Sequence, residues 1–268
     1  MSRFGLRSLL FFVAGVAVVC GLLFPALRSA REAARGMACR NNLKMIGIAL
    51  ENYCELSNST LPMAAEPGPD GRVWRSWRSQ LYPSMMESMP DFYDESSSWD
   101  SPTNMRILQG TPIPVVGKNG VAFTLPLERS LRPFTCTSEQ EKARRGINYL
   151  VVTGELTAFP RSKHVKISEI TDGLENTILV VESITCMPDW TEPRDLEFDA
   201  MSFVVNDLKF PSISSLHPQG PQVCFGDGQV YHLSTKATEA ELKALLTIAG
   251  NEGVRRRDLI DRGVLFGH

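Results

Sequence analysis

The sequence lacks the short motifs that would point to an enzyme. It contains no G-x-S-x-G nucleophile motif, no glycine-rich phosphate-binding loop and no H-E-x-x-H pair. Nucleophilic catalysis, nucleotide binding and zinc-protease activity therefore have no support in it. No two of its six cysteines form a C-x-x-C pair, so a zinc site of that kind is unsupported as well. We expect a protein that is not an enzyme.

A strong charge imbalance is also missing. The formal net charge is -2 at pH 7, which gives no sign of binding to nucleic acid. One basic run, Arg255 to Arg257, is answered by Asp258 and Asp261. We therefore predict that residues 254–268 form a solvated, charged C-terminal tail.

What the sequence does contain is one long uncharged apolar run, Leu9 to Leu27. As a helix rising about 1.5 Å per residue it would span roughly 28 Å, close to the ~30 Å hydrocarbon core of a bilayer. We predict a transmembrane anchor over residues 1–28, with the lipid bilayer as its partner. A cleaved signal peptide and a buried core helix are the alternatives, but Phe24 and Arg28 stand where a cleavage site requires a small residue.

The helical pattern continues beyond the anchor. Residues 5 to about 57 read as one helix with a predicted kink at Pro25, and residues 29–58 form its stalk. An apolar stripe recurs at three- and four-residue spacing, which predicts contact with the chain's own domain or, as the alternative, with a partner helix. It comprises Leu43, Ile46, Leu50 and Tyr53. We expect the helix to end at Ser57 to Ser59.

A globular domain is predicted over residues 59–253. A short helix is predicted within Trp74 to Met89, and residues 90 to 105 read as irregular. Short β-branched or aromatic runs then predict strands. They are Ile113 to Val116, Ala122 to Leu125, Ile147 to Thr153, Thr177 to Ile184, Met201 to Val205, Val223 to Phe225 and Val230 to Leu233. Asp227-Gly228 predicts a two-residue hairpin, and Ala237 to Ala249 a closing helix capped by Thr235 or Thr238. The order indicates an α+β domain on a helical stalk.

These pieces stand in the order of a known family. They are PALRSAREAARGMACRNNLKMIGIALENY (25–53), RSWRSQLYP (75–83), WDSPTN (99–104), FTC (134–136), INYLVVTG (147–154), ITDGLENTILVVE (170–182), WTEPRDLEFD (190–199), HPQGPQVCFGDGQV (217–230) and ALLTIAGNEGV (244–254). The chain resembles the prepilin-like proteins, abundant in planctomycete bacteria, that carry domain of unknown function 1559 and end in an H-x9-D-G motif.

The resemblance implies a type IV pilin-like fold, in which a long N-terminal helix packs on an antiparallel β-sheet with a small C-terminal helix. It also implies a single-pass protein of the cell inner membrane with a periplasmic domain. The arginines after the anchor favour the opposite orientation by the positive-inside rule. Prepilins carry a glycine before the cleaved bond and a glutamate beyond it, where this chain has Arg3 and Ser8. We therefore predict an uncleaved anchor and no pilus shaft.

The family motif here consists of His217, Asp227 and Gly228. If a strand separates the histidine from the turn, each residue advances about 3.3 Å, which would hold His217 and Asp227 apart. We therefore predict a tight turn at Asp227-Gly228 and a structural role for His217 in the loop leading to the strand, rather than a catalytic pair.

Calcium is the one cofactor with any support, because oxygen ligands suit it. Asp172, Gly173 and Asn176 predict a turn or, less favoured, part of a calcium loop, and Glu192 and Asp195 could contribute to a cation site. The wider acidic set is predicted to be a solvated loop with salt bridges. It comprises Glu182, Glu192, Asp195, Glu197 and Asp199.

Cys39 and Cys136 fall on family-matching positions, so the resemblance suggests a disulfide that pins the stalk to the domain. Closing so long a loop could stabilise the fold by up to ~4 kcal/mol. Two buried free thiols are the alternative. The leading functional hypothesis is a membrane-anchored, pilin-like structural or interaction protein, whose partners would be pilin-like subunits or envelope components. The second is a cell-surface module that binds a cation or a glycan.

Overall fold

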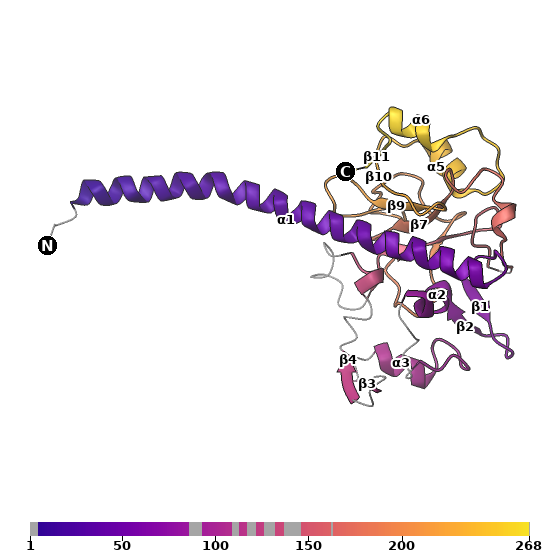
Figure 1. Ribbon diagram of the computed structural model, residues 1–268. Helices are drawn as coiled ribbons and strands as arrows, with labels where there is room; N and C mark the ends of the chain where they lie inside the picture. Colours follow the sequence, from indigo (N-terminus) through magenta and orange to yellow (C-terminus); the bar gives the residue numbers. More distant parts are fainter. Residues whose placement is uncertain are drawn as a thin grey trace.

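The molecule is a long helix that carries a folded domain on its C-terminal half (Figure 1). The computed structural model describes residues 5–85, 93–108, 113–116, 122–125, 132–136, 146–161 and 163–267. The predicted α+β class is confirmed, because helices and antiparallel sheets together build the described domain.

Helix α1 spans Leu6–Leu56 and includes Pro25, so the prediction of one continuous helix is confirmed. It ends where predicted, because Asn58 and Ser59 have positive φ angles of 53° and 58° that a helix cannot continue. Among the described residues, no helix combines the length and apolar character needed to cross a membrane. The predicted anchor therefore finds no support there, and the side chains of residues 6–10, 18–20 and 22 lie outside the description.

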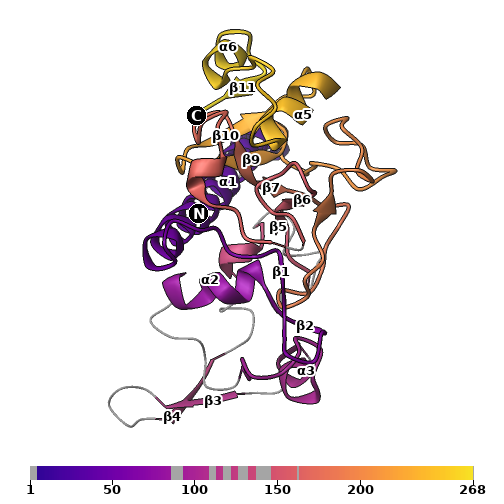
Figure 2. The ribbon, with the colours of Figure 1, turned by 90° about the vertical axis from the view of Figure 1, so that its right-hand side faces the viewer.

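The second half of α1 is built into the core. Leu43, Ile46 and Leu50 are buried and Tyr53 is partly buried, so the predicted stripe is confirmed as a contact with the chain's own domain. The helix contacts the sheet through β9 (Gln222–Phe225) and β10 (Val230–Leu233), and contacts α2 (Trp77–Met85) as well. Figure 2, turned by 90°, shows the sheet and α2 at different sides of α1.

One five-stranded antiparallel sheet forms the centre of the domain, in the order β11-β10-β9-β7-β5. Its remaining strands are β5 (Tyr149–Leu150), β7 (Ile178–Glu182) and β11 (Leu265–Phe266). All five residues of β7 are buried because the strand pairs on both sides and lies against packed side chains. Its sequence ILVVE is accordingly almost continuously apolar.

The other described elements lie outside this sheet. They are β1 (Ala65–Pro67), β2 (Val73–Ser76), α3 (Pro102–Leu108), β3 (Ile113–Val116), β4 (Ala122–Leu125), the 3₁₀ turns η1 (Arg132–Phe134) and η2 (Ile167–Glu169), β6 (Val152–Thr153) and β8 (Leu196–Glu197). β3 and β4 have the predicted bounds and pair antiparallel. The predicted helix begins at Trp77, after β2, and α3 lies within the segment predicted to be irregular.

Two strand predictions need correction. Met201 to Val205 forms no strand: only Ser202 makes an isolated bridge, to Ser212. Met201 and Val205 are nevertheless buried, so the apolar pattern marks a buried loop and not a hydrogen-bonded strand. The predicted strand Ile147 to Thr153 divides into β5 and β6, and β6 pairs in parallel with β8.

The C-terminal end also differs from the prediction. The closing helix α5 (Glu239–Leu246) is shorter than expected but is capped by Thr238, as proposed. Residues 254–267 are not a solvated tail. They contain α6 (Arg256–Asp261) and β11, and Leu259 and Leu265 are buried. The sequence did not predict this packing, because the buried apolar residues are widely spaced among charged ones and form no recognisable pattern.

Candidate functional site: a buried cluster of two cysteines, a glutamate and a histidine

Four side chains that can bind a metal meet inside the domain, beside α1. Cys39, Cys136, Glu182 and His217 each place one ligand atom in a group whose members all lie within 4.8 Å of one another. All four are buried. The cluster joins residues that are far apart in sequence, so it exists only because of the tertiary fold.

Each member comes from a different part of the chain. Cys39 lies on the face of α1 that also carries Glu32 and the buried Gly36, at helical three- and four-residue spacing. Cys136 follows η1, and Glu182 is the last residue of β7. His217 lies in the loop before β9. The site therefore links the helix to the centre of the sheet.

The two cysteines predicted to pair lie together, with their Sγ atoms 2.9 Å apart. At this separation the two sulfurs are not covalently bonded, so the disulfide stays a prediction. The separation lies between the ~2.05 Å of a disulfide and the ~3.8 Å that follows for two thiolates on one tetrahedral zinc with Zn–S bonds of ~2.3 Å. Cys136 is held in place by its backbone N–H, which donates to Asn148 Oδ1 at 3.0 Å.

His217 is oriented by acidic groups at both ring nitrogens. Nδ1 lies 2.7 Å from Glu32 Oε1, while Nε2 lies 3.2 Å from Cys136 Sγ and 3.6 Å from Glu182 Oε1. Burial opposes the charged ring, but hydrogen bonds to Cys39 and Glu32 and the negative charge of Glu182 raise the pKa of His217 to about 9.

Glu182 is a carboxyl group in a fully buried position. Oε2 accepts a hydrogen bond from the Gln222 backbone N–H at 3.0 Å, whereas Oε1 has no hydrogen-bond partner among the described residues. Burial raises the pKa of Glu182 to about 7, against the opposing charge of His217. A buried carboxylate oxygen without a hydrogen bond is costly unless a cation compensates it.

Sequence reasoning missed most of this cluster. Glu182 was assigned to a solvated acidic loop, which is wrong because it is the last residue of β7, a fully buried strand of the central sheet. His217 does more than shape the loop before β9, because its ring points into the cluster. The available signal was the glutamate closing the apolar run ILVVE, together with Glu32 and Cys39 on the helix face that continues into the stripe.

The other motif residues have a separate role. Gly228 has a φ of +74°, and the hairpin bond joins Phe225 N–H to Gln229 O, so the turn holds three residues rather than two. Asp227 pairs with Arg256 at 2.7 Å. The Arg256 guanidinium lies over the Phe225 ring, 5.1 Å from its centroid. These partners agree with the expectation that Asp227 belongs to a turn and does not form a pair with His217.

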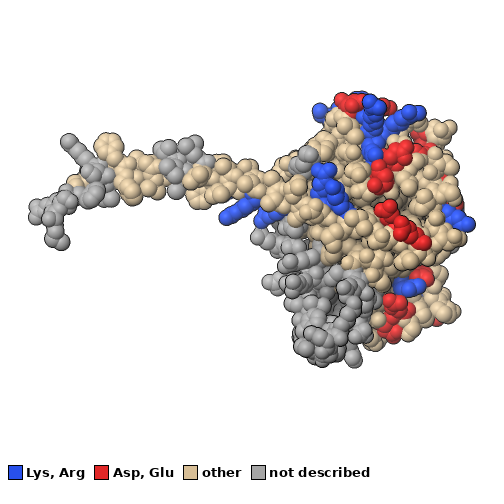
Figure 3. All heavy atoms as spheres, viewed as in Figure 1, with Lys and Arg blue, Asp and Glu red and all other residues tan. Residues whose placement is uncertain are grey.

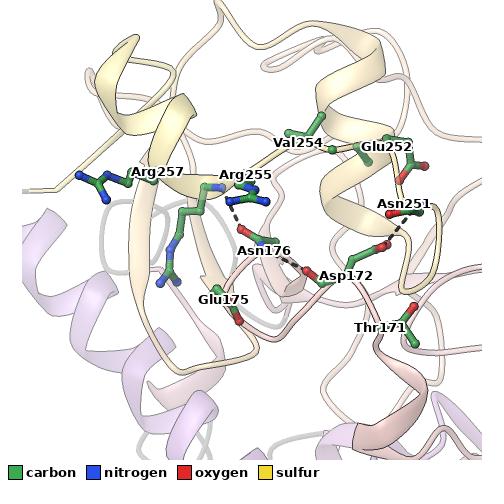
Figure 4. A pocket seen from close by; sticks show the side chains of 12 residues that line it. Thr171, Asp172, Glu175, Asn176, Asn251, Glu252, Val254, Arg255 and Arg257 are labelled. Atoms are coloured by element: carbon green, nitrogen blue, oxygen red, sulfur yellow. Dashed lines mark hydrogen bonds between the residues drawn. The ribbon is translucent and has the colours of Figure 1, made fainter.

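The residues suggested for calcium have protein partners instead. Asp172 accepts the backbone N–H groups of Gly250 and Asn251 at 2.8 and 3.0 Å. Asn176 bonds to the Asp172 carbonyl and to the Arg256 backbone N–H. Both line a cavity of about 550 Å³ that also contains Arg255 and Arg257 (Figure 4). The side-chain oxygens of Asp172 and Asn176 thus hold the C-terminal segment in place. The Asn176 bond to the Asp172 carbonyl closes the turn that was predicted for these residues.

Glu192 and Asp195 were expected in the same solvated set, and for Asp195 this is wrong. Asp195 is buried in an ion pair with the equally buried Arg78, at 2.7 Å, and burial raises its pKa despite the pair. Arg78 also donates to the carbonyl oxygens of Trp190 and Glu192. The Glu192 carboxylate pairs with Arg194. Glu197 pairs with Arg161, as expected of a solvated acidic residue.

The comparisons with known proteins identify one relationship. A family model described as "Protein of unknown function (DUF1559)" matches residues 28–208, which is more than half of the chain. No curated protein and no solved structure matches the chain. The match includes Cys39, Cys136 and Glu182, and it ends before His217.

Proposed function

We propose that this chain, which belongs to the DUF1559 family, is a pilin-like structural or interaction protein without catalytic activity. In this proposal the N-terminal part of α1 anchors the chain in the cell inner membrane as a single uncleaved pass. The folded domain is presented on the periplasmic side, where pilin-like subunits or envelope components would be its partners.

The proposal rests on the N-terminal part of α1, here called the arm, which extends beyond the domain (Figure 1). Its described apolar side chains are open to the surroundings: Phe11 is 80% exposed, Phe12 68% and Phe24 61%. Burying one such side chain contributes about 1.5–3 kcal/mol. Contiguous apolar surface of this kind marks contact with a membrane or another protein.

The distribution of charge supports the same arrangement. Figure 3 shows acidic and basic side chains interspersed over the domain, whereas the described part of the arm shows neither before the basic residues near the domain. Arg28 and Arg31 are the first basic residues after the apolar run. Basic side chains at the end of an apolar helix suit the polar boundary of a bilayer.

Fractionation of cells with alkaline carbonate tests the attachment. We expect the full chain in the membrane pellet and a Val13→Arg/Val16→Arg variant in the soluble fraction, because charge in lipid is costly. The matched control is Val204→Arg/Leu208→Arg, which places the same charges on exposed apolar positions of the domain. It should stay in the pellet. A soluble wild-type chain would overturn the membrane part of the proposal.

Reporter fusions after residue 268 test the orientation. Active alkaline phosphatase together with a dark fluorescent protein would support a periplasmic domain. The reverse result would place the domain in the cytoplasm and remove every role outside the cell. Pull-down of a pilin-like subunit, lost in the arm variant and kept in the domain control, would identify the partner surface.

A further inference from the structure

We propose that Cys39, Cys136, Glu182 and His217 bind one zinc ion in a closed, structural site that fastens α1 to the sheet. The inference rests on the donor atoms and their surroundings, and it does not depend on where the arm of α1 is placed.

The donor set is one that zinc prefers. Two thiolate sulfurs, one imidazole nitrogen and one carboxylate oxygen complete a tetrahedron, and structural zinc sites are closed by four protein ligands. The ligand atoms lie within 4.8 Å of one another, and the edges of such a tetrahedron measure about 3.3–3.8 Å, so small side-chain movements would bring them onto one ion. From 2.9 Å, the two sulfurs need to separate by about 1 Å.

The histidine is prepared for metal binding from outside the cluster. Glu32 Oε1 takes the hydrogen bond from Nδ1 at 2.7 Å, which leaves Nε2 directed at Cys136 and Glu182. Metal-bound histidines commonly give their second N–H to a carboxylate in this way, and that contact fixes the ring orientation. Glu32 acts here as a positioning residue, with its side chain 24% exposed at the edge of the site.

The glutamate supplies the observation that separates zinc from a disulfide. A disulfide is neutral and uses only the two sulfurs, so it leaves Glu182 Oε1 without a hydrogen bond. A cation bound to Oε1 compensates that oxygen, while Oε2 keeps its bond from the Gln222 N–H. The His217 ring lies 3.6 Å from Oε1, beyond hydrogen-bond distance, so a bound cation satisfies this oxygen where a disulfide alone does not.

Zinc binding is a proton exchange in which nothing is oxidised or reduced. The ion forms bonds to both sulfurs, to Nε2 and to Oε1, while the two thiol protons and any proton on Nε2 or Glu182 pass to solvent. The four ligands come from α1, from the segment after η1, from β7 and from the loop before β9. One ion thus joins the helix to segments far away in sequence.

The first test is metal content. We would purify the full chain in detergent under reducing conditions, without chelator, and measure zinc by elemental analysis and native mass spectrometry. One equivalent is expected in wild type and almost none in Cys39→Ser. Cys186→Ser is the matched control, because Cys186 is a buried cysteine outside the cluster. Equal zinc in all three proteins would overturn the proposal.

Glu32→Gln tests the positioning of His217 without removing a ligand. The zinc affinity, measured by competition with a chromogenic chelator, should fall by about 10–100-fold, as is typical when an outer partner of a metal ligand is lost. Unchanged affinity would contradict the role given to Glu32.

Two wild-type measurements keep the proposal testable if Cys39→Ser fails to fold. X-ray absorption of the zinc-loaded chain should show two sulfur neighbours together with nitrogen and oxygen, and a shell of only nitrogen and oxygen would overturn the site. A chain that lacks zinc, is lighter by two hydrogen atoms and yields a Cys39–Cys136 linked peptide would show the disulfide instead. A reduced chain that takes up no added zinc would also refute the proposal.

Discussion

The two halves of α1 share one backbone helix but have opposite surroundings. Through residues 11–17 and 23–31 every described side chain is exposed, whereas from Gly36 onward buried positions recur on one face. The first half carries the uncharged apolar run Leu9 to Leu27, and the second has a single apolar stripe that packs on the domain. Helix formation therefore says little about environment, and the distribution of apolar residues around the helix says much more.

The largest expected difference between the halves comes from deleting them in turn. A chain of residues 29–268 should fold, because all the helix positions described as buried lie at Gly36 or beyond. A chain of residues 58–268 should not, because it lacks Cys39, Leu43 and Ile46 of the core. Thermal melting by circular dichroism should give a cooperative transition only for the longer chain. Cooperative melting of residues 58–268 would contradict the comparison.

Single truncations should repeat the contrast at smaller scale. Leu43→Ala leaves a cavity in the core and should lower the free energy of unfolding by about 2–5 kcal/mol. Phe12→Ala, in the arm, should leave the stability of the domain unchanged because its side chain is 68% exposed. Urea unfolding of both variants in the same detergent checks this. An equal loss in both would mean that the arm is coupled to the domain.

Two glycines offer a matched pair for the opposite change, from small to large. A Cβ at Gly47 would lie 3.1 Å from Cys224 Sγ and 3.3 Å from Gly228 Cα, where α1 approaches the hairpin. Gly47→Leu should therefore cost about 1–3 kcal/mol through overpacking. Gly15→Leu meets nothing within 4 Å and should cost the domain nothing. Differential scanning calorimetry should show a lower melting temperature of the domain for Gly47→Leu only. An unchanged melting temperature in that variant would contradict the close approach of α1 to the hairpin.

The smallest expected effect lies at the far end of the domain. Thr238 caps α5 by accepting the Glu241 N–H, and Thr238→Ala should cost about 1 kcal/mol. Ser29→Ala in α1 removes only an exposed bond to the Ala26 carbonyl and should leave the melting temperature of the domain unaltered. A larger shift for Ser29→Ala than for Thr238→Ala would reverse the expected order of the two regions.

The accuracy of the sequence predictions follows the range of the interactions. Helix α1, its stripe and the bounds of β3, β4 and β10 follow from local patterns, and they were predicted. The cap at Thr238 is one of the two that were proposed. The segment Met201 to Val205 was assigned to a strand because a short apolar run does not distinguish a strand from a buried loop. The packing of α6 depends on Leu259, which is surrounded by charged neighbours in sequence.

The candidate site shows the same division more sharply. Cys39 and Cys136 were paired in advance, but only through the family resemblance. Glu182 and Asp195 looked like surface acids, because burial of a carboxylate depends on partners that are distant in sequence: Arg78 for Asp195, and the cysteines and His217 for Glu182.

By itself, the sequence determined the long helix, its change from an all-apolar arm to an amphipathic stalk, and the α+β class, because these depend on periodicities within a few residues. Only the tertiary structure decided that the end of β7, the loop before β9 and the segment after η1 meet α1 at one point. The physical reason is that metal-binding side chains become a site through their positions in space. Those positions are fixed when the sheet closes against the helix.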